Sequence, residues 1–228
     1  MIDNRHRHVG SVFGVIEMLE NVSKLNIVRI GECITYSSLK EIAEKILESF
    51  GGMIEEFKIF HHKAPAVDTI DALLLTMVLH EEIGGHILGI TGADLTTQDE
   101  DEFYNTIFGG KNAINNVAVV STKRLEPSDV TTEANYDLYV DRTIKVSLHE
   151  VGHNFGLTDH ASYKLAKDGS LCPMSRGEFN KFGYLGYVRA IIDGRGHHFC
   201  DECTQFLKKI RPFQRRFPRL LKDKWHLH

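Results

Sequence analysis

One short pattern constrains this sequence more than any other: two histidines four residues apart, with a glutamate beside the first. His149 and His153 lie on a segment, Val140 to Phe155, that we expect to be one long helix. Residues four apart fall on one helix face, so both imidazoles can bind one metal ion. Zinc bound in this way keeps an open coordination position and lowers the pKa of a bound water. Glu150 can reach that water without binding the metal, and the pattern therefore predicts a zinc site with Glu150 as general base.

The residues that follow the helix favour this prediction over the alternative, a surface helix that carries these side chains by chance. Gly156 comes three residues after His153. A glycine at that point can adopt the left-handed turn that ends a helix. The chain can then turn back, so that Asp159 or His160 supplies a third ligand.

Apolar runs and glycines predict the rest of the fold. We expect strands at 25–30, 53–60, 87–91 and 116–121, and a weaker strand at 103–108. A capping box of Ser38 and Glu41 predicts a helix that ends at Gly51, and 70–79 reads as a buried helix. Gly109 and Gly110 indicate a turn. Alternation of strands and helices implies a mostly parallel sheet, hence an α/β fold.

Domain organisation follows from where this alternation stops. We expect an N-terminal α/β subdomain over residues 1–156, which includes the zinc-binding helix. The remainder, 157–228, is rich in Gly, His and Cys and predicts an irregular C-terminal subdomain. It ends in a basic tail from Lys208 onward, with apolar residues at near-helical spacing. We favour an amphipathic helix that packs on the domain or on another subunit, and keep contact with nucleic acid or an anionic membrane as the alternative.

Composition narrows the class of protein. The chain has 228 residues and a formal net charge of −4, which does not indicate a nucleic-acid-binding protein. Its longest apolar stretch, Ala72 to Leu79, is too short to span a membrane. We expect no secretory signal and a cytoplasmic location. In a reducing cytosol the four cysteines are thiols or metal ligands rather than disulfides. Nothing in the sequence indicates an oligomeric state.

Several motifs together resemble the archaemetzincin branch of the metzincin clan of zinc metalloproteases. The helix pattern and its glycine are similar to the start of the metzincin signature. Downstream, a Cys-x-Met and a Cys-x-x-Cys motif follow in the order that archaemetzincins have. The matching segments, which extend from Ile87 to Cys203, are 88–91 with Asp94, 119–121 with Arg124 and Leu125, 149–156, 172–174 and 200–203.

This resemblance implies a metzincin-like zincin with two zinc ions, one catalytic and one structural. Met174 would be the Met-turn residue beneath the catalytic zinc. Metzincins usually place a third histidine ten residues after the first, and here that position holds Asp159. We favour Asp159 as third ligand, since the snapalysin metzincins are similar in this respect. The alternatives are His160 as the ligand, after a one-residue slip, and Asp159 as a residue that orients a ligand histidine.

Archaemetzincins are expected to hold the structural zinc with four cysteines, the first directly after the third catalytic ligand. His160 occupies that position here, so we expect a Cys₃His site. Its members would be His160, Cys172, Cys200 and Cys203. His197 and His198, just before Cys200, compete with His160 as the fourth ligand.

The resemblance implies a peptidase that binds a peptide or protein substrate along an exposed edge strand. We expect that edge near 103–108. The acidic residues between Asp94 and Glu102 either form a solvated turn, which is the commoner arrangement, or favour substrates with basic residues. An alternative of another class is a zinc-stabilised, non-catalytic binding protein with a degenerate site, which the aspartate at residue 159 motivates.

Overall fold

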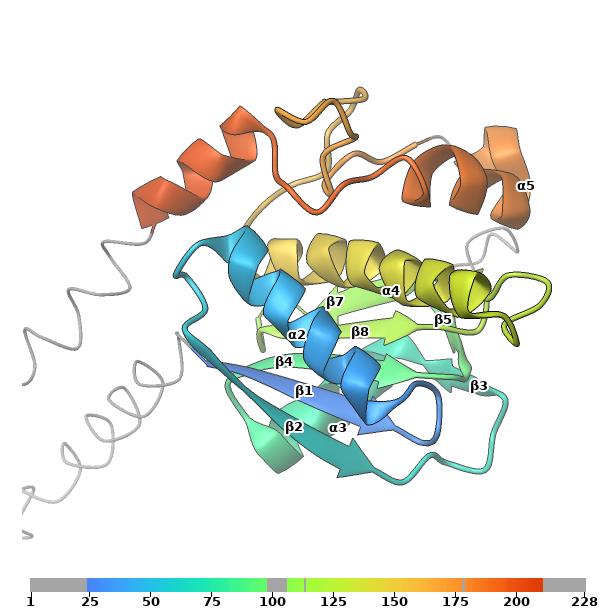
Figure 1. Ribbon diagram of the computed structural model, residues 1–228. Helices are drawn as coiled ribbons and strands as arrows, with labels where there is room; N and C mark the ends of the chain where they lie inside the picture. Colours follow the sequence, from blue (N-terminus) through green and yellow to red (C-terminus); the bar gives the residue numbers. More distant parts are fainter. Residues whose placement is uncertain (1–23, 98–105, 113, 178, 211–228) are drawn as a thin grey trace, which may run out of the picture.

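A five-stranded sheet forms the centre of the molecule (Figure 1). The computed structural model describes residues 24–97, 106–112, 114–177 and 179–210. Four strands of the sheet are parallel, and the last pairs antiparallel with β8. In spatial order they are β2 (Glu56–His62), β1 (Lys24–Ile30), β4 (His86–Thr91), β8 (Val117–Ser121) and β7 (Gly109–Asn112). The predicted α/β fold with a mixed, mostly parallel sheet is confirmed.

Alternating side chains of the central strands divide between two hydrophobic cores. In β8, Ala118 and Val120 point to the first core, while Val117 and Val119 point to the second. Successive strand residues face opposite sides of a sheet, so one apolar run serves both faces. A central parallel strand covered on both faces therefore reads as a continuous apolar stretch, as residues 117–120 do.

Helices cover both faces of the sheet (Figure 1). On one face lie α2 (Tyr36–Phe50) and α4 (Glu133–Asn154), whose buried residues belong to the first core. The opposite face carries α3 (Ala72–Ile83), which belongs to the second core. A small second sheet comprises β3 (Thr69–Asp71), β5 (Asp94–Thr96) and β6 (Thr106–Ile107).

Three helix starts differ from the sequence prediction because the capping residue lies elsewhere. The N-cap of α2 is Thr35, whose hydroxyl accepts from the Ser38 N–H, so Ser38 does not start the helix. In α3 the N-cap is Asp71, because the residues before it form β3. In α4 it is Thr132, and the helix begins seven residues before Val140. Side-chain oxygens at these positions satisfy N–H groups that the first helical turn leaves open.

Two further predictions near β7 need correction. Gly109 and Gly110 do not form a turn but begin β7, the edge strand. Of the predicted strand at 103–108, residues 103–105 lie outside the described residues, 106–107 form β6, which pairs with β5, and Phe108 is not part of a strand. The other acidic residues of the 94–102 stretch lie outside the described residues, and Asp94 forms an ion pair with Arg124.

The chain beyond α4 lies over the α2 and α4 layer (Figure 1). Residues 157–177 are largely irregular, and α5 (Phe179–Tyr187) and a π-helix (Val188–Ile192) follow. Residues 201–210 are helical, with Leu207 buried in the first core, and the basic tail beyond them lies outside the described residues. The predicted boundary at residue 156 remains a prediction. In the described chain, no helix combines the length and apolarity that crossing a membrane requires.

Candidate active site and metal centres

Helix α4 ends in a turn that brings the following loop back to the histidines. Gly156 has φ +83, and its N–H donates to the His153 carbonyl at 2.9 Å. The Leu157 N–H donates to the Gly152 carbonyl at 3.0 Å. These two bonds and the left-handed glycine form a Schellman motif. Asp159 thereby returns to the face of α4 that carries His149 and His153.

Backbone carbonyls orient both histidine rings. His149 Nδ1 lies 2.9 Å from the Pro173 oxygen, and His153 Nδ1 lies 2.9 Å from the Leu157 oxygen. A carbonyl can only accept, so each Nδ1 carries the proton and donates. The lone pair of each ring is then on Nε2, which is the arrangement of metal-binding histidines. Burial lowers the pKa of His149, which keeps this ring neutral.

The two Nε2 atoms converge on one carboxylate oxygen. Asp159 Oδ1 lies 3.5 Å from His149 Nε2 and 3.4 Å from His153 Nε2. This oxygen is buried and has no hydrogen-bond partner among the described residues. Three electron-pair donors that face one another need a cation between them. Tetrahedral zinc, with bonds of about 2.0–2.2 Å, would separate such atoms by about 3.4 Å. The three residues therefore fit a zinc ion.

The charge of Asp159 suits a ligand. Burial raises the pKa of its carboxyl, but the adjacent His153, His149 and Arg176 outweigh that effect and hold the pKa below its usual value. The carboxylate is therefore ionised without the help of a metal. His160, the alternative third ligand, is not brought to this cluster.

Glu150 lies against the backbone of the edge strand β7. Its side chain is 7% exposed, and burial raises its pKa to about 7. A Cβ at Gly109 would stand 2.6 Å from Cγ and 2.7 Å from Oε1 of this glutamate. Only a glycine leaves room there for the carboxylate. A carboxyl group whose pKa is near neutral can both accept and release a proton, as a general base must.

A cavity of about 290 Å³ opens beside these groups. Both histidines, Glu150 and Asp159 line it. The residues around them come from the segment 107–111, the middle of α4 and the chain after Met174, and they include Lys111, Val146, Arg176, Tyr187, Ile192 and Arg195. Strand β7 thus borders the cavity, together with Ile107 and Phe108 from the predicted edge at 103–108.

Met174 lies beneath α4, fully buried. A Cβ at Gly152, between the two histidines of the helix, would stand 2.6 Å from the Met174 sulphur. The same segment holds His149, through the carbonyl of Pro173, and His160, whose N–H donates to the Met174 carbonyl at 2.9 Å. The role of Met174 as a Met-turn residue stays a prediction.

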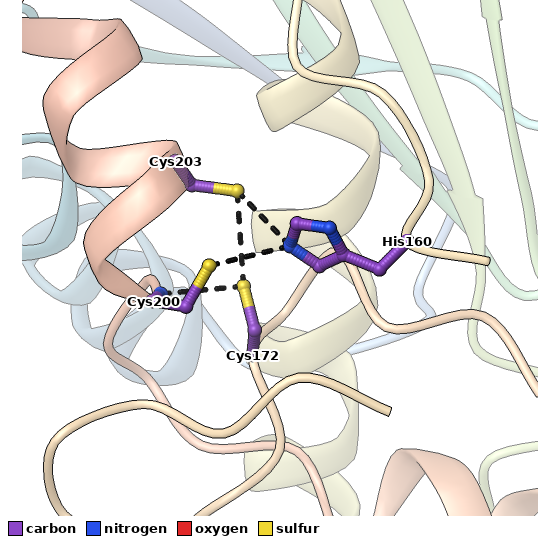
Figure 2. Close-up of side chains that lie close together, drawn as sticks. All are labelled: His160, Cys172, Cys200 and Cys203. Carbon is purple, nitrogen blue, oxygen red and sulfur yellow. Dashed lines mark hydrogen bonds between the residues drawn. The ribbon is translucent and has the colours of Figure 1, made fainter. Parts of the chain in front are cut away.

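A second cluster gathers His160 with three buried cysteines (Figure 2). His160 Nε2 lies 3.3 Å from both Cys200 Sγ and Cys203 Sγ, and Cys203 Sγ lies 3.9 Å from Cys172 Sγ. A tetrahedral Cys₃His zinc site has ligand separations of about 3.5–3.8 Å. A hydrogen bond with Cys203 holds the pKa of the Cys172 thiol below its usual value. The donor set fits zinc.

The competing histidines lie elsewhere. His197 Nε2 is 2.8 Å from Asp141 Oδ1, and His198 is exposed. Cys33 is also outside the cluster, with its thiol 3.4 Å from the Ile90 oxygen. Sequence reasoning missed Gly109, because paired glycines usually mark turns. It also missed Arg195, since no local motif signals a side chain that reaches the cavity from a distant loop.

Comparison with known proteins agrees with this geometry. The model of peptidase family M54 matches residues 66–168. The archaemetzincin of Thermococcus kodakarensis is 38% identical over 71 residues, and that of Methanopyrus kandleri is 27% identical over 125 residues. These matches cover 31% and 54% of this chain, and 36% and 55% of the relatives. The chain therefore matches from about a third to about half of the length of these curated relatives.

Solved structures are similar over more of the chain. The crystal structure of the Methanopyrus kandleri archaemetzincin superimposes with a TM-score of 0.61 at 25% identity, covering 83% of this chain and 95% of that one. The archaemetzincin from Archaeoglobus fulgidus, solved in complex with malonate, gives 0.55 at 21% identity, with 80% and 99% covered. At that identity the second likeness concerns the fold alone.

Fold and clusters together define an α/β protein with two candidate metal sites, one of them on a His-Glu-x-x-His helix that faces an open cavity. The chain is similar to the archaemetzincins, peptidase family M54, in sequence and in fold.

Proposed function

We propose that this protein is a zinc-dependent metallopeptidase of archaemetzincin type that hydrolyses peptide bonds at the cavity beside α4. One observation carries the proposal: Glu150, buried and with a pKa near 7, borders the same cavity as His149, His153 and Asp159, whose ligand atoms converge. These three would hold the catalytic zinc. His160, Cys172, Cys200 and Cys203 would hold a structural zinc.

Zinc supplies Lewis acidity: it polarises a carbonyl group and lowers the pKa of water toward about 7. The chain supplies the proton transfers. Glu150 accepts a proton from the water that attacks the scissile carbonyl, and then donates it to the leaving amine nitrogen. The glycine backbone at residue 109 lets this carboxylate reach the cavity. The Pro173 and Leu157 carbonyls keep the two histidines in one tautomer throughout.

Strand β7 offers the substrate a backbone template. It pairs with β8 along one side, and it ends the sheet within the described residues. A peptide in extended form would add to the other side by strand addition, with its scissile bond over Glu150. Main-chain hydrogen bonds of this kind hold a substrate irrespective of sequence, so specificity must come from the cavity.

A cleavage assay with two controls tests the proposal. The zinc-loaded protein is incubated with a mixed peptide library, and products are identified by mass spectrometry. Glu150→Gln serves as the catalytic control, because it keeps size and hydrogen bonding but removes the base. Zinc content is measured for both proteins. Cleavage by the wild type alone, with equal zinc in both, is the expected result. Equal and negligible turnover in both would instead favour the zinc-stabilised, non-catalytic binding protein.

The reducing cytoplasm is the compartment we propose for this activity. No disulfide involves the four cysteines, and three of them lie in the candidate structural site. Thiol ligands need reducing conditions to stay available to zinc.

A further inference from the structure

Arg195 is a buried cation in the wall of the candidate active site. It is 4% exposed and lines the same cavity as Glu150. Its Nε and Nη2 both donate to a single acceptor, the Ser175 carbonyl oxygen, at 3.2 and 2.9 Å. A guanidinium has five N–H donors in a planar fork that matches a carboxylate. One carbonyl oxygen therefore leaves most of this capacity unused.

A buried charge is costly unless an opposite charge pairs with it. Among the described residues, no carboxylate forms an ion pair with Arg195. The carboxylates that pair with arginines do so with Arg29, Arg124, Arg142 and Arg176. The two carboxylates that line the cavity with Arg195 are Glu150, which is assigned to proton transfer, and Asp159, which is assigned to the metal. The chain thus builds a buried cation and supplies no carboxylate for it.

The opening of the cavity carries more positive charge. Lys111, on the edge strand, is exposed and lines the opening. Arg176 is 61% exposed and contacts Asp159 only at 3.5 Å. Three cations therefore face two carboxylates, and a zinc ion would increase the excess. The positive electrostatic potential in such a cleft attracts anionic groups.

The rest of the wall is apolar. Val146 from α4 and Ile192 from the π-helix line the cavity and are buried. A side chain that ends in a carboxylate but has an aliphatic stem fits this combination. Glutamate and aspartate have that form, and so does the C-terminal end of a peptide with an aliphatic last residue.

Resting on the proposed function, we propose that Arg195 is a specificity-determining residue, which receives a carboxylate of the peptide substrate beside the scissile bond. The enzyme is then selective for peptides with an acidic residue at that position. Lys111 and Arg176 guide this group into the cavity. Arg195 also has a structural contact, because it holds the Ser175 carbonyl next to Met174. A purely structural role would affect all substrates alike, and this difference makes the proposal testable.

The test compares matched peptides that differ at one position, with Glu, Gln or Lys beside the scissile bond. Each is prepared with a free and an amidated C-terminus, which separates a side-chain carboxylate from a terminal one. Charge-assisted hydrogen bonds predict a kcat/KM about 10- to 100-fold higher for Glu than for Gln. A selectivity that follows the free C-terminus instead assigns Arg195 to the terminal carboxylate. A Glu-to-Gln ratio near one, with no effect of the C-terminus, overturns the proposal.

Variants then assign the selectivity to the residue. Arg195→Met should reduce the Glu-to-Gln ratio to near one, and Arg195→Lys should keep part of it. A folded Arg195→Met protein that retains the wild-type ratio overturns the proposal. Should Arg195→Met fail to fold, Arg195→Lys decides, since an unchanged ratio there contradicts a bidentate contact. The double variant Lys111→Ser, Arg176→Ser, with both changes at the surface, should lower kcat/KM for the Glu peptide. This kcat/KM should also depend less on salt concentration than that of the wild type.

A binding measurement distinguishes a wrong role for Arg195 from a wrong proposed function. Zinc-loaded Glu150→Gln is titrated with labelled Glu and Gln peptides, and fluorescence anisotropy is recorded. Suppose that the wild type cleaves no peptide, while Glu peptides still bind about 10-fold tighter than Gln peptides through Arg195. The site is then selective, and the proposed function is wrong. If the wild type cleaves peptides without regard to acidity, the proposed function holds and this inference is wrong.

Discussion

Gly152 lies directly against the sulphur of Met174, so that a Cβ at residue 152 would stand 2.6 Å from Sδ and 3.4 Å from Leu157 Cδ1. Two effects of Gly152→Ala oppose each other. Alanine is favoured over glycine within a helix by about 1 kcal/mol. Overpacking a buried site costs about 1–3 kcal/mol. Met174 is fully buried, so we expect the second effect to be larger.

Gly152→Ala should therefore lower the free energy of unfolding by up to about 2 kcal/mol, measured by urea denaturation of the zinc-loaded protein. Adding Met174→Ala to the same chain removes the clash, and should make the alanine at 152 no longer destabilising relative to Met174→Ala alone. If Gly152→Ala alone were more stable than the wild type, Met174 would have to move aside without cost.

Gly109→Ala should impair activity rather than stability. The new methyl group would lie within 2.6–2.8 Å of three atoms of Glu150 and displace its carboxylate. Displacing a catalytic group by about 1 Å costs about 100-fold in rate. Gly110→Ala is the matched control, because its Cβ would approach Ile107 and Ala72 only to 3.2 and 3.3 Å and does not meet Glu150. We expect unchanged zinc content in both variants. Equal kcat/KM in the two would contradict this role of Gly109.

Cys172→Ser combined with Cys203→Ser should remove one of two zinc ions and lower the melting temperature. Two of four ligands are lost, and structural zinc contributes directly to folding free energy. Cys33→Ser controls for the loss of a thiol outside the cluster, and His160→Cys should retain both ions. Metal content by mass spectrometry and thermal denaturation are the measurements. Unchanged stoichiometry and stability in the double variant would exclude the structural site.

His86 should make the protein sensitive to mild acid. Its ring stacks on Phe155, with centroids 4.8 Å apart, and burial lowers its pKa to about 4. The unfolded chain, with a pKa near 6.5, binds the proton more readily than the folded one. Stability is therefore fully present above pH 6.5 and falls by about 3 kcal/mol down to pH 4.

Comparison with His86→Phe isolates this contribution, because both proteins share every other titrating group. The difference in free energy of unfolding between them should change between pH 6.5 and 4, and become constant below pH 4. A difference that stays flat across this range would show that His86 is not buried in neutral form.

How far the sequence predicts this molecule depends on how local the signal is. The spacing of His149 and His153 and the glycine at 156 are local, so the helix, its end and the returning Asp159 follow from them. The apolar runs predict the buried strands. By contrast, β7 begins with two glycines, and the reason for the first, Gly109, is the close approach of Glu150, which no local pattern contains. The start of α2 was misplaced by three residues, because both Thr35 and Ser38 can cap a helix.

Long-range contacts explain what was missed at the site. Arg195 reaches the cavity because Leu171 and the backbone at 194 and 196 are hydrogen-bonded across the C-terminal region. No spacing rule contains that pairing. His160 and the three cysteines could be grouped in advance only because their order resembles a known family. The choice among His160, His197 and His198 depended on geometry, which brings His160 alone to the sulphur atoms.

Asp159 and His160 are consecutive, yet their side chains belong to different clusters. We therefore expect occupancy of the two sites to be thermodynamically linked, because a single peptide bond joins the two residues. Zinc at the cysteines would fix the backbone at 160, and the aspartate next to it would then lose less conformational entropy on binding the second ion. Linkage is reciprocal, so each ion raises the affinity for the other by the same factor. We expect chelators to remove the two ions cooperatively, which would make the protein respond to zinc supply as a switch with two populated states, loaded and empty.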